Sequence, residues 1–400
     1  MRKLKPIVIL SVFVLLVGCA GMQTAEMESQ KAVKVPTSFH MPFGGSALNS
    51  PYVWLQAQSD AAMFPAQVSG TNQNLKTNKA LASAMIPADR LNETFKVKGP
   101  KNDKKRVSNL RWEDDGETTL SLYEGNRLVL AYHYGVMQPP KGVPSHRARS
   151  SYFHPIKGLD GETFTEDFPA DHYHHRGLYF AWPGVFYNNK RYDMWHLFGM
   201  WTKCEKILVK EEGPVFALLI VQNGWYTKDE KVMDEVMAVK VWHSDHHGQA
   251  MDLTFTWTPL AKIRIGPKDY KGYGGLNFRF PNREATVVTN SDGKQNSSNL
   301  KRSPWADMSA RFGGRKHKSG VSIMNHPANI DPNPGWTLRT GDHYGFLGVS
   351  WPGKDSFTFL PNNEYENQYR VWLHRGTVED GQTQTVFNTY INSPMLEVSK

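Results

Sequence analysis

The sequence predicts an all-β protein, built as a large antiparallel β-sandwich in one domain. Short apolar segments recur at roughly even spacing between turns rich in glycine, proline and asparagine. The clearest segment, residues 250–258, alternates strictly between apolar and polar side chains, which is typical of a strand with one buried and one solvated face. Long helical periodicity is nearly absent. A propeller is the alternative, but we find no repeat of about 40 to 50 residues.

The beginning of the chain has the pattern of a bacterial lipoprotein signal. Basic residues precede an apolar run over residues 6–17, which is too short for a membrane-spanning helix of about 20 residues. Residues 16–19 match a lipobox, the pattern in which a cysteine is lipidated and becomes the new N-terminus. We therefore expect cleavage of residues 1–18 and lipidation of Cys19, with the lipid as the chain's only membrane contact. Ala20 stands where an aspartate often retains lipoproteins at the inner membrane, so we expect the outer membrane.

Composition divides the rest of the chain into three parts. Residues 19–50 are polar and are predicted to form the lipidated N-terminus and a flexible tether. Residues 51–92 are an N-terminal extension punctuated by prolines, in which residues 79–85 are candidates for a short helix. Residues 93–400 are predicted to form the single β-sandwich domain. Its first element is a hairpin over residues 118–134, and further strands are expected at residues 215–222, 236–242, 250–258, 276–280, 320–324, 344–349 and 366–373.

Cysteine content and net charge exclude some kinds of site and favour one class of ligand. After cleavage Cys204 is the one thiol besides the lipidated residue, which excludes a structural disulfide and a cysteine-based zinc site. Loss of three basic residues with the signal lowers the formal net charge from +9 to +6. A moderately basic, aromatic-rich exported protein suits an acidic, ring-shaped ligand such as a uronic or sulfated sugar. The compartment and the lack of a basic run argue against nucleic acid as a partner.

The densest group of reactive side chains is residues 171–177, with the sequence Asp-His-Tyr-His-His-Arg-Gly. We expect its histidines and tyrosine to act as acids and bases, its aspartate to orient a histidine or contact substrate, and its arginine to bind an anionic group. If the segment is extended, it presents two faces, His172, His174 and Arg176 on one and Asp171, Tyr173 and His175 on the other. The alternative interpretation is a polar network that locks a loop to the sandwich. No cofactor is specified, but a divalent metal could bind His172 and His174, although no tight metal-binding spacing is present.

Two further regions add candidate site residues. His154 precedes a Gly-Leu-Asp-Gly turn at residues 158–161, and a hairpin there would bring this histidine to the cluster as another catalytic group. The alternative, which a lone histidine before a proline favours, is a residue that packs in the turn. Proline and asparagine density predicts loops between residues 325 and 345, and loops on a rigid sheet often carry sites. The alternative for these loops is a well-packed crossover. Their candidate substrate-binding residues are His326, Arg339, His343 and Tyr344.

Several blocks, in collinear order from about residue 128 to 376, resemble the methane-oxygenase-PmoA-like family. They are His154-Pro155, the turn at 158–161, residues 171–178 with Trp182, Asn223-Gly224-Trp225, Trp305-Ala306-Asp307, residues 326–329 and residues 336–339. The resemblance implies a galactose-mutarotase-like sandwich, a place among sugar-processing proteins, and Trp182 as a substrate contact. It does not extend to the copper membrane oxygenase of the label, because the chain lacks a transmembrane helix. Thr337, Asn325 and Tyr273 depart from the histidine, aspartate and glutamate that relatives carry.

Three functions remain open from the sequence. The first is elimination on acidic oligosaccharides by a lyase or dehydratase, which needs a cation for the carboxylate, a base and an acid. The second is a glycoside hydrolase, which needs two carboxylates across the bond, and Asp171, Asp193 and Asp307 are available. The third is a non-catalytic sugar-binding lipoprotein of a polysaccharide-utilisation system, because tryptophan rings stack on sugars.

Overall fold

The computed structural model describes residues 31–42, 52–74, 79–99, 110–268, 271–392 and 394–399. The predicted signal segment and Cys19 lie outside the described residues, so the lipidation prediction is not addressed by the structure. Residues 33–400 form one compact unit. No helix in the described part of the chain has the length and apolar content of a membrane-crossing segment.

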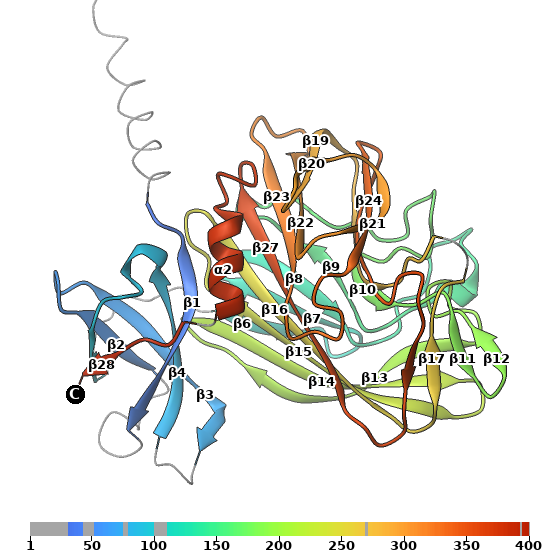
Figure 1. Ribbon diagram of the computed structural model, residues 1–400, viewed down its shortest axis with the longest axis horizontal. Coiled ribbons are helices and arrows are strands. Elements are labelled where there is room, and N and C mark those ends of the chain that lie inside the picture. Colours follow the sequence, from blue (N-terminus) through green and yellow to red (C-terminus); the bar gives the residue numbers. More distant parts are fainter. Residues whose placement is uncertain are drawn as a thin grey trace, which may run out of the picture. The chain divides into compact units, whose positions relative to one another are not determined.

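The N-terminal part of this unit, for which the sequence predicted no definite fold, is a six-stranded sheet (Figure 1). Its order is β1 (Lys34–Pro42), β4 (Lys79–Pro87), β3 (Met63–Asn74), β2 (Tyr52–Ala57), β5 (Phe95–Lys98) and β28 (Val398–Ser399). Two boundaries therefore need correction: β1 lies in the predicted tether, and β5 and β28 belong to this sheet and not to the sandwich. The helix proposed for residues 79–85 is strand β4, because pairing with β1 and β3 buries Ala80, Ala82 and Ala84 and overrides their helix propensity.

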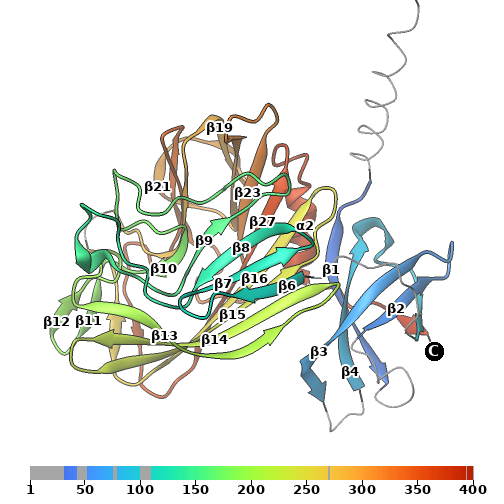
Figure 2. The same ribbon diagram turned by 180° about the vertical axis from the view of Figure 1, so that it is seen from behind.

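The main body confirms the predicted all-β class and the large antiparallel sandwich. Two nine-stranded sheets, in which every pairing is antiparallel, face each other across one core (Figures 1 and 2). The first sheet runs β21 (Ser298–Arg302), β24 (Gly335–Gly341), β25 (Tyr344–Ser350), β18 (Gly275–Phe280), β10 (Leu178–Ala181), β9 (Tyr152–Ile156), β8 (Arg127–His133), β7 (Thr119–Glu124), β6 (Leu110–Asp114). The second runs β13 (Met200–Glu211), β14 (Phe216–Thr227), β15 (Lys231–Trp242), β16 (Gly248–Pro259), β27 (Tyr365–Arg375), β23 (Ser319–Asn325), β22 (Trp305–Phe312), β19 (Arg283–Asn290), β20 (Gly293–Gln295).

Smaller elements complete the described fold. A four-stranded sheet has the order β12 (Lys190–Tyr192), β11 (Val185–Tyr187), β17 (Ile263–Ile265), β26 (Phe357–Phe359). Two 3-10 turns are η2 (Ala88–Arg90) and η3 (Ser145–Arg147), and helix α2 spans Thr383–Asn392. The helix buries Val386 and Phe387 in a second apolar cluster with Val35 of β1 and Trp242 of β15. This cluster joins the N-terminal sheet to the outer face of the second sandwich sheet.

Alternation along the strands produces the main core. Strand β16 buries Met251, Leu253, Phe255 and Trp257, as the period of two in the sequence predicts. The predicted hairpin is also present, because β7 and β8 pair across a turn in which Gly125 has a φ of 60°.

One carboxyl group lies inside this core. Glu235 accepts hydrogen bonds from Asn223 Nδ2 (2.8 Å), Trp225 Nε1 (2.9 Å) and Trp257 Nε1 (2.8 Å). Burial raises the pKa of the Glu235 carboxyl, although these three hydrogen bonds act in the opposite direction. The tryptophans therefore both fill the core and satisfy its buried polar group.

Substitution of Trp257 by alanine tests this dependence. The side chain is fully buried, so Trp257→Ala leaves a cavity and removes one hydrogen bond from Glu235. We expect a loss of about 3–5 kcal/mol in the free energy of unfolding, measured by urea denaturation. The matched control is Trp201→Ala on β13, where the side chain is 37% exposed. Equal losses in the two variants would contradict the assignment of Trp257 to the core.

Candidate functional site

The histidine-rich segment folds as consecutive turns ahead of β10, and the extended conformation considered from the sequence is wrong. The His172 backbone N–H donates to the Pro169 carbonyl (3.0 Å), and the His175 N–H donates to the His172 carbonyl (2.8 Å). Residues 172, 174 and 175 consequently point to one region instead of alternating between two faces. Arg176, the last polar residue before Gly177, turns to a different environment.

The imidazoles line a cavity of about 230 Å³ at one face of the first sandwich sheet. Its walls come from the segment just described, the loop after β12, the segment before β18, and strands β24 and β25. The lining residues are His172, His174, His175, Trp195, His196, Lys271, Tyr273, Thr337, Arg339, Tyr344 and Phe346. We call this space the imidazole cavity. The structure thus unites the predicted cluster with Arg339 and Tyr344 from the predicted third region.

Stacked rings hold the imidazoles in place. His172 is sandwiched, with ring centroids 4.8 Å from His175 and 4.9 Å from Tyr344 and interplanar angles of 6° and 8°. The rings of His174 and His196 lie 4.2 Å apart. Planar packing of this kind fixes ring orientation without using the nitrogen atoms, which stay available for hydrogen bonds.

Two of these histidines are held neutral. Burial, followed by the proximity of His196 and His172, lowers the pKa of His174 to about 2. Burial, with His174 and His172 close by, also lowers the pKa of His175 well below its ordinary value. Neither imidazole carries a proton charge at neutral pH, so both offer hydrogen-bonding nitrogens without repelling Lys271 or Arg339.

His196 differs because it has a carboxylate partner. Its Nδ1 lies 2.9 Å from Asp193 Oδ2, and its backbone N–H donates to Asp193 Oδ1 (2.8 Å). Asp193 is 4% exposed and also accepts a hydrogen bond from Lys268 Nζ (3.1 Å). Burial acts to raise the pKa of Asp193, but the contacts with His196 and Lys268 outweigh it and lower the pKa. An ionised carboxylate behind an imidazole orients the ring and stabilises its protonated form.

A second His–Asp contact anchors the loop to the sheet. His172 Nδ1 lies 3.0 Å from Asp171 Oδ2, while Arg279 of β18 binds both oxygens of Asp171 at 3.1 and 2.9 Å. The same guanidinium donates through Nε to Glu166 (3.0 Å) and lies 4.7 Å from the ring centroid of Tyr344. Although burial acts to raise the pKa of Asp171, the His172 and Arg279 contacts lower it. Asp171 therefore positions the loop and does not line the cavity.

Arg176 needs the clearest correction among the predicted catalytic residues. Its side chain is fully buried and binds the Asp167 carboxylate and the Tyr152 hydroxyl. It also donates to the Arg147 carbonyl (2.9 Å) and lies 3.5 Å from the ring centroid of Phe168. Those contacts use its donors within the protein, so it cannot receive a substrate anion. Arg339, which lines the cavity, is the arginine placed to bind such an anion.

The remaining predicted residues also lie apart from the cavity lining. Trp182, proposed as a substrate contact, is 1% exposed in the core and donates to the Trp351 carbonyl (2.6 Å). His154 pairs with Thr165 Oγ1 (3.0 Å), and His326 packs against Tyr390 with centroids 5.2 Å apart. Two predicted residues, Tyr173 and His343, are exposed. The side chains of all these residues are buried in the core, packed against other residues or exposed, and none of them lines the cavity.

Sequence reasoning missed several residues of this site, including the cavity-lining Trp195, Thr337 and Phe346. Arg279, His196, Lys271 and Tyr273 were not predicted as site residues, and Asp193 was considered only as a hydrolase carboxylate. The Asp193-x-x-His196 spacing was the available signal, since a turn of that length brings the two side chains together. No comparable local signal marks Arg279, because strand pairing brings it to Asp171 from 108 residues away. Within the described ranges no three His, Cys, Asp or Glu side chains are arranged to hold a metal ion.

Fold and site together define a β-sandwich protein with a cationic, imidazole-lined cavity. A family model described as "Family of unknown function (DUF6807)" matches residues 99–388, and the chain belongs to that family. The resemblance to the methane-oxygenase-PmoA-like family is therefore corrected. Short motif blocks gave the wrong family, whereas a model that spans most of the chain weighs every position between them. No curated protein matches the chain.

Solved structures give distant matches. A galactose mutarotase related enzyme from Lactobacillus acidophilus is 8% identical, with a TM-score of 0.35 over 67% of this chain and 98% of that one. A glycosyl hydrolase family 38 protein from Enterococcus faecalis is 12% identical (TM-score 0.43; 90% and 45%). A mutant of the heparan sulfate lyase HepC from Pedobacter heparinus is 11% identical (TM-score 0.36; 70% and 38%). The chain spans less than half of the latter two, and at these scores the likeness carries no argument about chemistry.

The neutral state of His174 has a consequence for stability. Below the ordinary histidine pKa of about 6.5 the unfolded chain takes up a proton at this position and the folded chain does not. The free energy of unfolding should therefore fall as the pH decreases from about 7 to about 5. We expect His174→Gln to flatten this dependence in urea denaturation at the two pH values, with His317→Gln at an exposed position as control. An unchanged slope in His174→Gln would contradict a neutral, buried imidazole.

Proposed function

We propose that the protein is a carbohydrate-active enzyme that cleaves acidic oligosaccharides by β-elimination at a uronic residue. The observation that carries this proposal is the composition of the imidazole cavity. Two cationic side chains, Lys271 and Arg339, share it with neutral imidazoles and the phenols of Tyr273 and Tyr344. Elimination next to a carboxylate requires a cation, a base and an acid within one site.

The cations account for the acidic substrate. Arg339 is held by the carbonyls of Ser298 (2.9 Å) and Leu338 (2.8 Å) and by Asn299 Oδ1 (2.8 Å), so its position is set before a ligand arrives. A uronic carboxylate bound by Arg339 and Lys271 loses much of its negative charge. That neutralisation makes the hydrogen on the adjacent carbon more acidic, because the resulting carbanion spreads its charge into the carboxylate.

We assign His196 as the base and Tyr344 as the acid. Asp193 holds the His196 ring and faces the imidazolium that forms when His196 takes the substrate proton, whereas burial, with His196 and His172 close by, disfavours a proton on His174. Burial raises the pKa of Tyr344, although contact with Arg339 partly offsets it, so the phenol keeps its proton until a leaving oxygen takes it. The proton on the carbon next to the carboxylate passes to His196. The electron pair of the broken C–H bond forms the carbon–carbon double bond. The glycosidic C–O bond breaks at the same time, and Tyr344 protonates the departing oxygen.

Hydrolysis fits this cavity less well. Its described lining contains no carboxylate, while a glycosidase ordinarily uses two. The three candidate aspartates are otherwise engaged: Asp193 with His196, Asp171 with Arg279, and fully buried Asp307 with His374 Nε2 (2.7 Å) and Ser322 Oγ (2.8 Å). The alternative is a non-catalytic sugar-binding role, and the activity assay distinguishes it from catalysis.

The assay is the appearance of unsaturated uronic product, measured as absorbance near 235 nm over a panel of acidic oligosaccharides. We expect His196→Ala to lower kcat by about 10²–10⁴-fold, and Tyr344→Phe to do the same, because each removes a proton-transfer group. His317→Ala, an exposed histidine, should keep full activity. Binding without turnover would identify a sugar-binding protein, and reducing ends without new absorbance would identify a hydrolase.

Arg339 tests the substrate charge separately. Removal of one charged hydrogen-bonding group should reduce kcat/KM on acidic substrates by about 10–100-fold. The matched variant is Arg302→Ala, where the arginine lies on neighbouring β21 with its side chain 60% exposed. Equal activity of Arg339→Ala and Arg302→Ala would show that Arg339 has no part in the mechanism.

We further propose that the enzyme acts while anchored at the outer membrane through a lipid on Cys19. The lipobox and the basic, apolar segment before it support this placement. Cys19→Ser should release the protein from the membrane fraction, measured by fractionation and by incorporation of labelled palmitate. Cys204→Ser, which changes the half-buried thiol on β13, is the control and should stay membrane-bound. Retention of palmitate by Cys19→Ser would overturn the anchor.

A further inference from the structure

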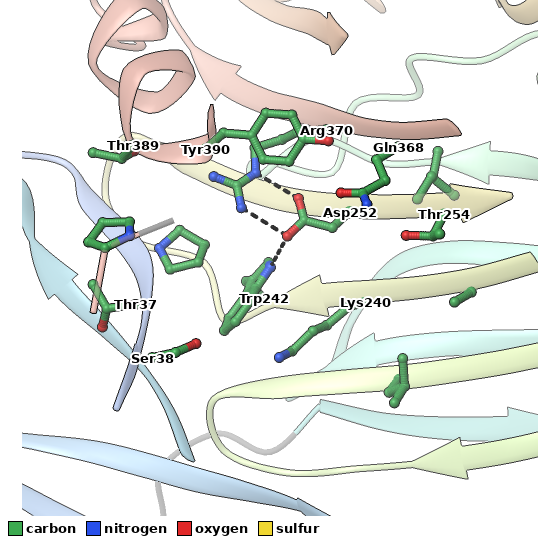
Figure 3. A pocket seen from close by; sticks show the side chains of 15 residues that line it. Thr37, Ser38, Lys240, Trp242, Asp252, Thr254, Gln368, Arg370, Thr389 and Tyr390 are labelled. Carbon is green, nitrogen blue, oxygen red and sulfur yellow. Dashed lines mark hydrogen bonds and ion pairs between the residues drawn. The ribbon is translucent and has the colours of Figure 1, made fainter. Parts of the chain in front are cut away.

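A second cavity, of about 470 Å³, lies between the N-terminal sheet and the outer face of the second sandwich sheet (Figure 3). Strand β1 forms one wall, strands β14, β15, β16 and β27 form the floor, and α2 closes another side. The lining residues are Pro36, Thr37, Ser38, Leu218, Ala238, Lys240, Trp242, Asp252, Leu253, Thr254, Gln368, Arg370, Thr389, Tyr390 and Pro394. It shares no lining residue with the imidazole cavity. Its volume falls in the range of about 300–1,000 Å³ that is usual for small-molecule sites.

A buried guanidinium faces this cavity with an unused donor. Arg370 is 4% exposed and binds Asp252 through Nε (2.6 Å) and one terminal nitrogen (2.8 Å). Trp242 Nε1 donates to the same carboxylate (2.7 Å), and Figure 3 shows the three groups converging. The other terminal nitrogen, Nη1, has no hydrogen-bond partner among the described residues. A buried charged donor without an acceptor is costly, so its presence beside a cavity points to a ligand oxygen.

Lys240 supplies the net charge of the cavity. Its ammonium lies 3.9 Å from the ring centroid of Phe216 and 4.1 Å from that of Trp242, and it donates to Ser83 Oγ (3.2 Å). Since Asp252 offsets Arg370, Lys240 leaves one positive charge in excess. Burial lowers the pKa of Lys240 to about 8, although Asp252 and Glu211 act to raise it. The pair of aromatic rings stabilises the Lys240 ammonium inside the cavity.

The polar part of the neutral lining consists of four hydroxyl side chains and one amide. They are Thr37, Ser38, Thr254, Thr389 and Gln368, and the aromatic lining residues Trp242 and Tyr390 also contact Lys240 and Arg370. Several hydroxyls next to flat rings suit a polyhydroxylated ring, and one excess cation suits one anionic group. We propose that this cavity is a second binding site, separate from the imidazole cavity, for an acidic sugar of one or two rings.

Titration calorimetry with D-glucuronate tests the proposal. The full chain carrying Arg339→Ala is used, so that binding at the imidazole cavity is weakened and failure of the proposed reaction does not affect the readout. We expect one glucuronate per chain, with D-glucose at least tenfold weaker because it lacks the anionic group. Lys240→Met should raise the Kd at least tenfold. Lys231→Met, on the same strand but paired with Glu205 and Asp234, should leave it unchanged.

Two further measurements keep the proposal falsifiable if Lys240→Met folds poorly. Ser38→Trp fills the cavity without altering its charge and should abolish binding and the rise in Tm that glucuronate produces. Affinity should also fall as the pH passes from 7 to 9, because Lys240, which faces Asp252, Glu211 and Arg370, loses its proton. No binding in the Arg339→Ala chain, or equal binding in Ser38→Trp, would overturn the second site.

Discussion

The guanidinium of Arg279 is the interaction on which the site depends. It lies in strand β18, 1% exposed, and binds two carboxylates of a segment more than 100 residues away. Backbone bonds reinforce the contact, since the Arg279 N–H donates to the Gly177 carbonyl and its carbonyl accepts from Glu166. Together with the stacking of His172 on Tyr344, this clamp fixes the turns that carry His172, His174 and His175 to the sheet.

The clamp also sets the electrostatics of the imidazole cavity. Arg279 binds the Asp171 carboxylate, which therefore does not line the cavity. The cavity lining therefore contains cations and no carboxylate, and burial together with the neighbouring imidazoles keeps His174 and His175 neutral. His196 is set apart from these two by its contact with the Asp193 carboxylate. His196 thus has a carboxylate partner that His174 and His175 lack, and acid–base roles arise from differences of that kind.

The two cavities use different surfaces of one scaffold. The imidazole cavity is built by loops and by strands β24 and β25 of the first sheet. The second cavity lies on the outer face of the other sheet, where the N-terminal sheet and α2 cover strands that would otherwise face water. Both hold an excess of positive charge, in keeping with the basic composition of the chain. A stiff antiparallel sandwich allows such separation, since neither site requires the other to form.

Local pattern by itself determined the sandwich strands and the place of the imidazole cluster. The alternation at Met251, Leu253, Phe255 and Trp257 is a property of neighbouring residues, and so is the crowding of histidines at 172–175. Only tertiary structure decided which charged groups meet. Arg176 and Arg339 look equally suited to bind an anion in the sequence, yet one is enclosed by Asp167 and Tyr152 while the other lines the cavity. The Ala-rich strand β4 shows the same limit, because pairing partners and not propensity made it a strand. The physical reason is that the free energy of a charge or a backbone hydrogen bond depends on the partner that strand pairing brings to it, and the partner is distant in sequence.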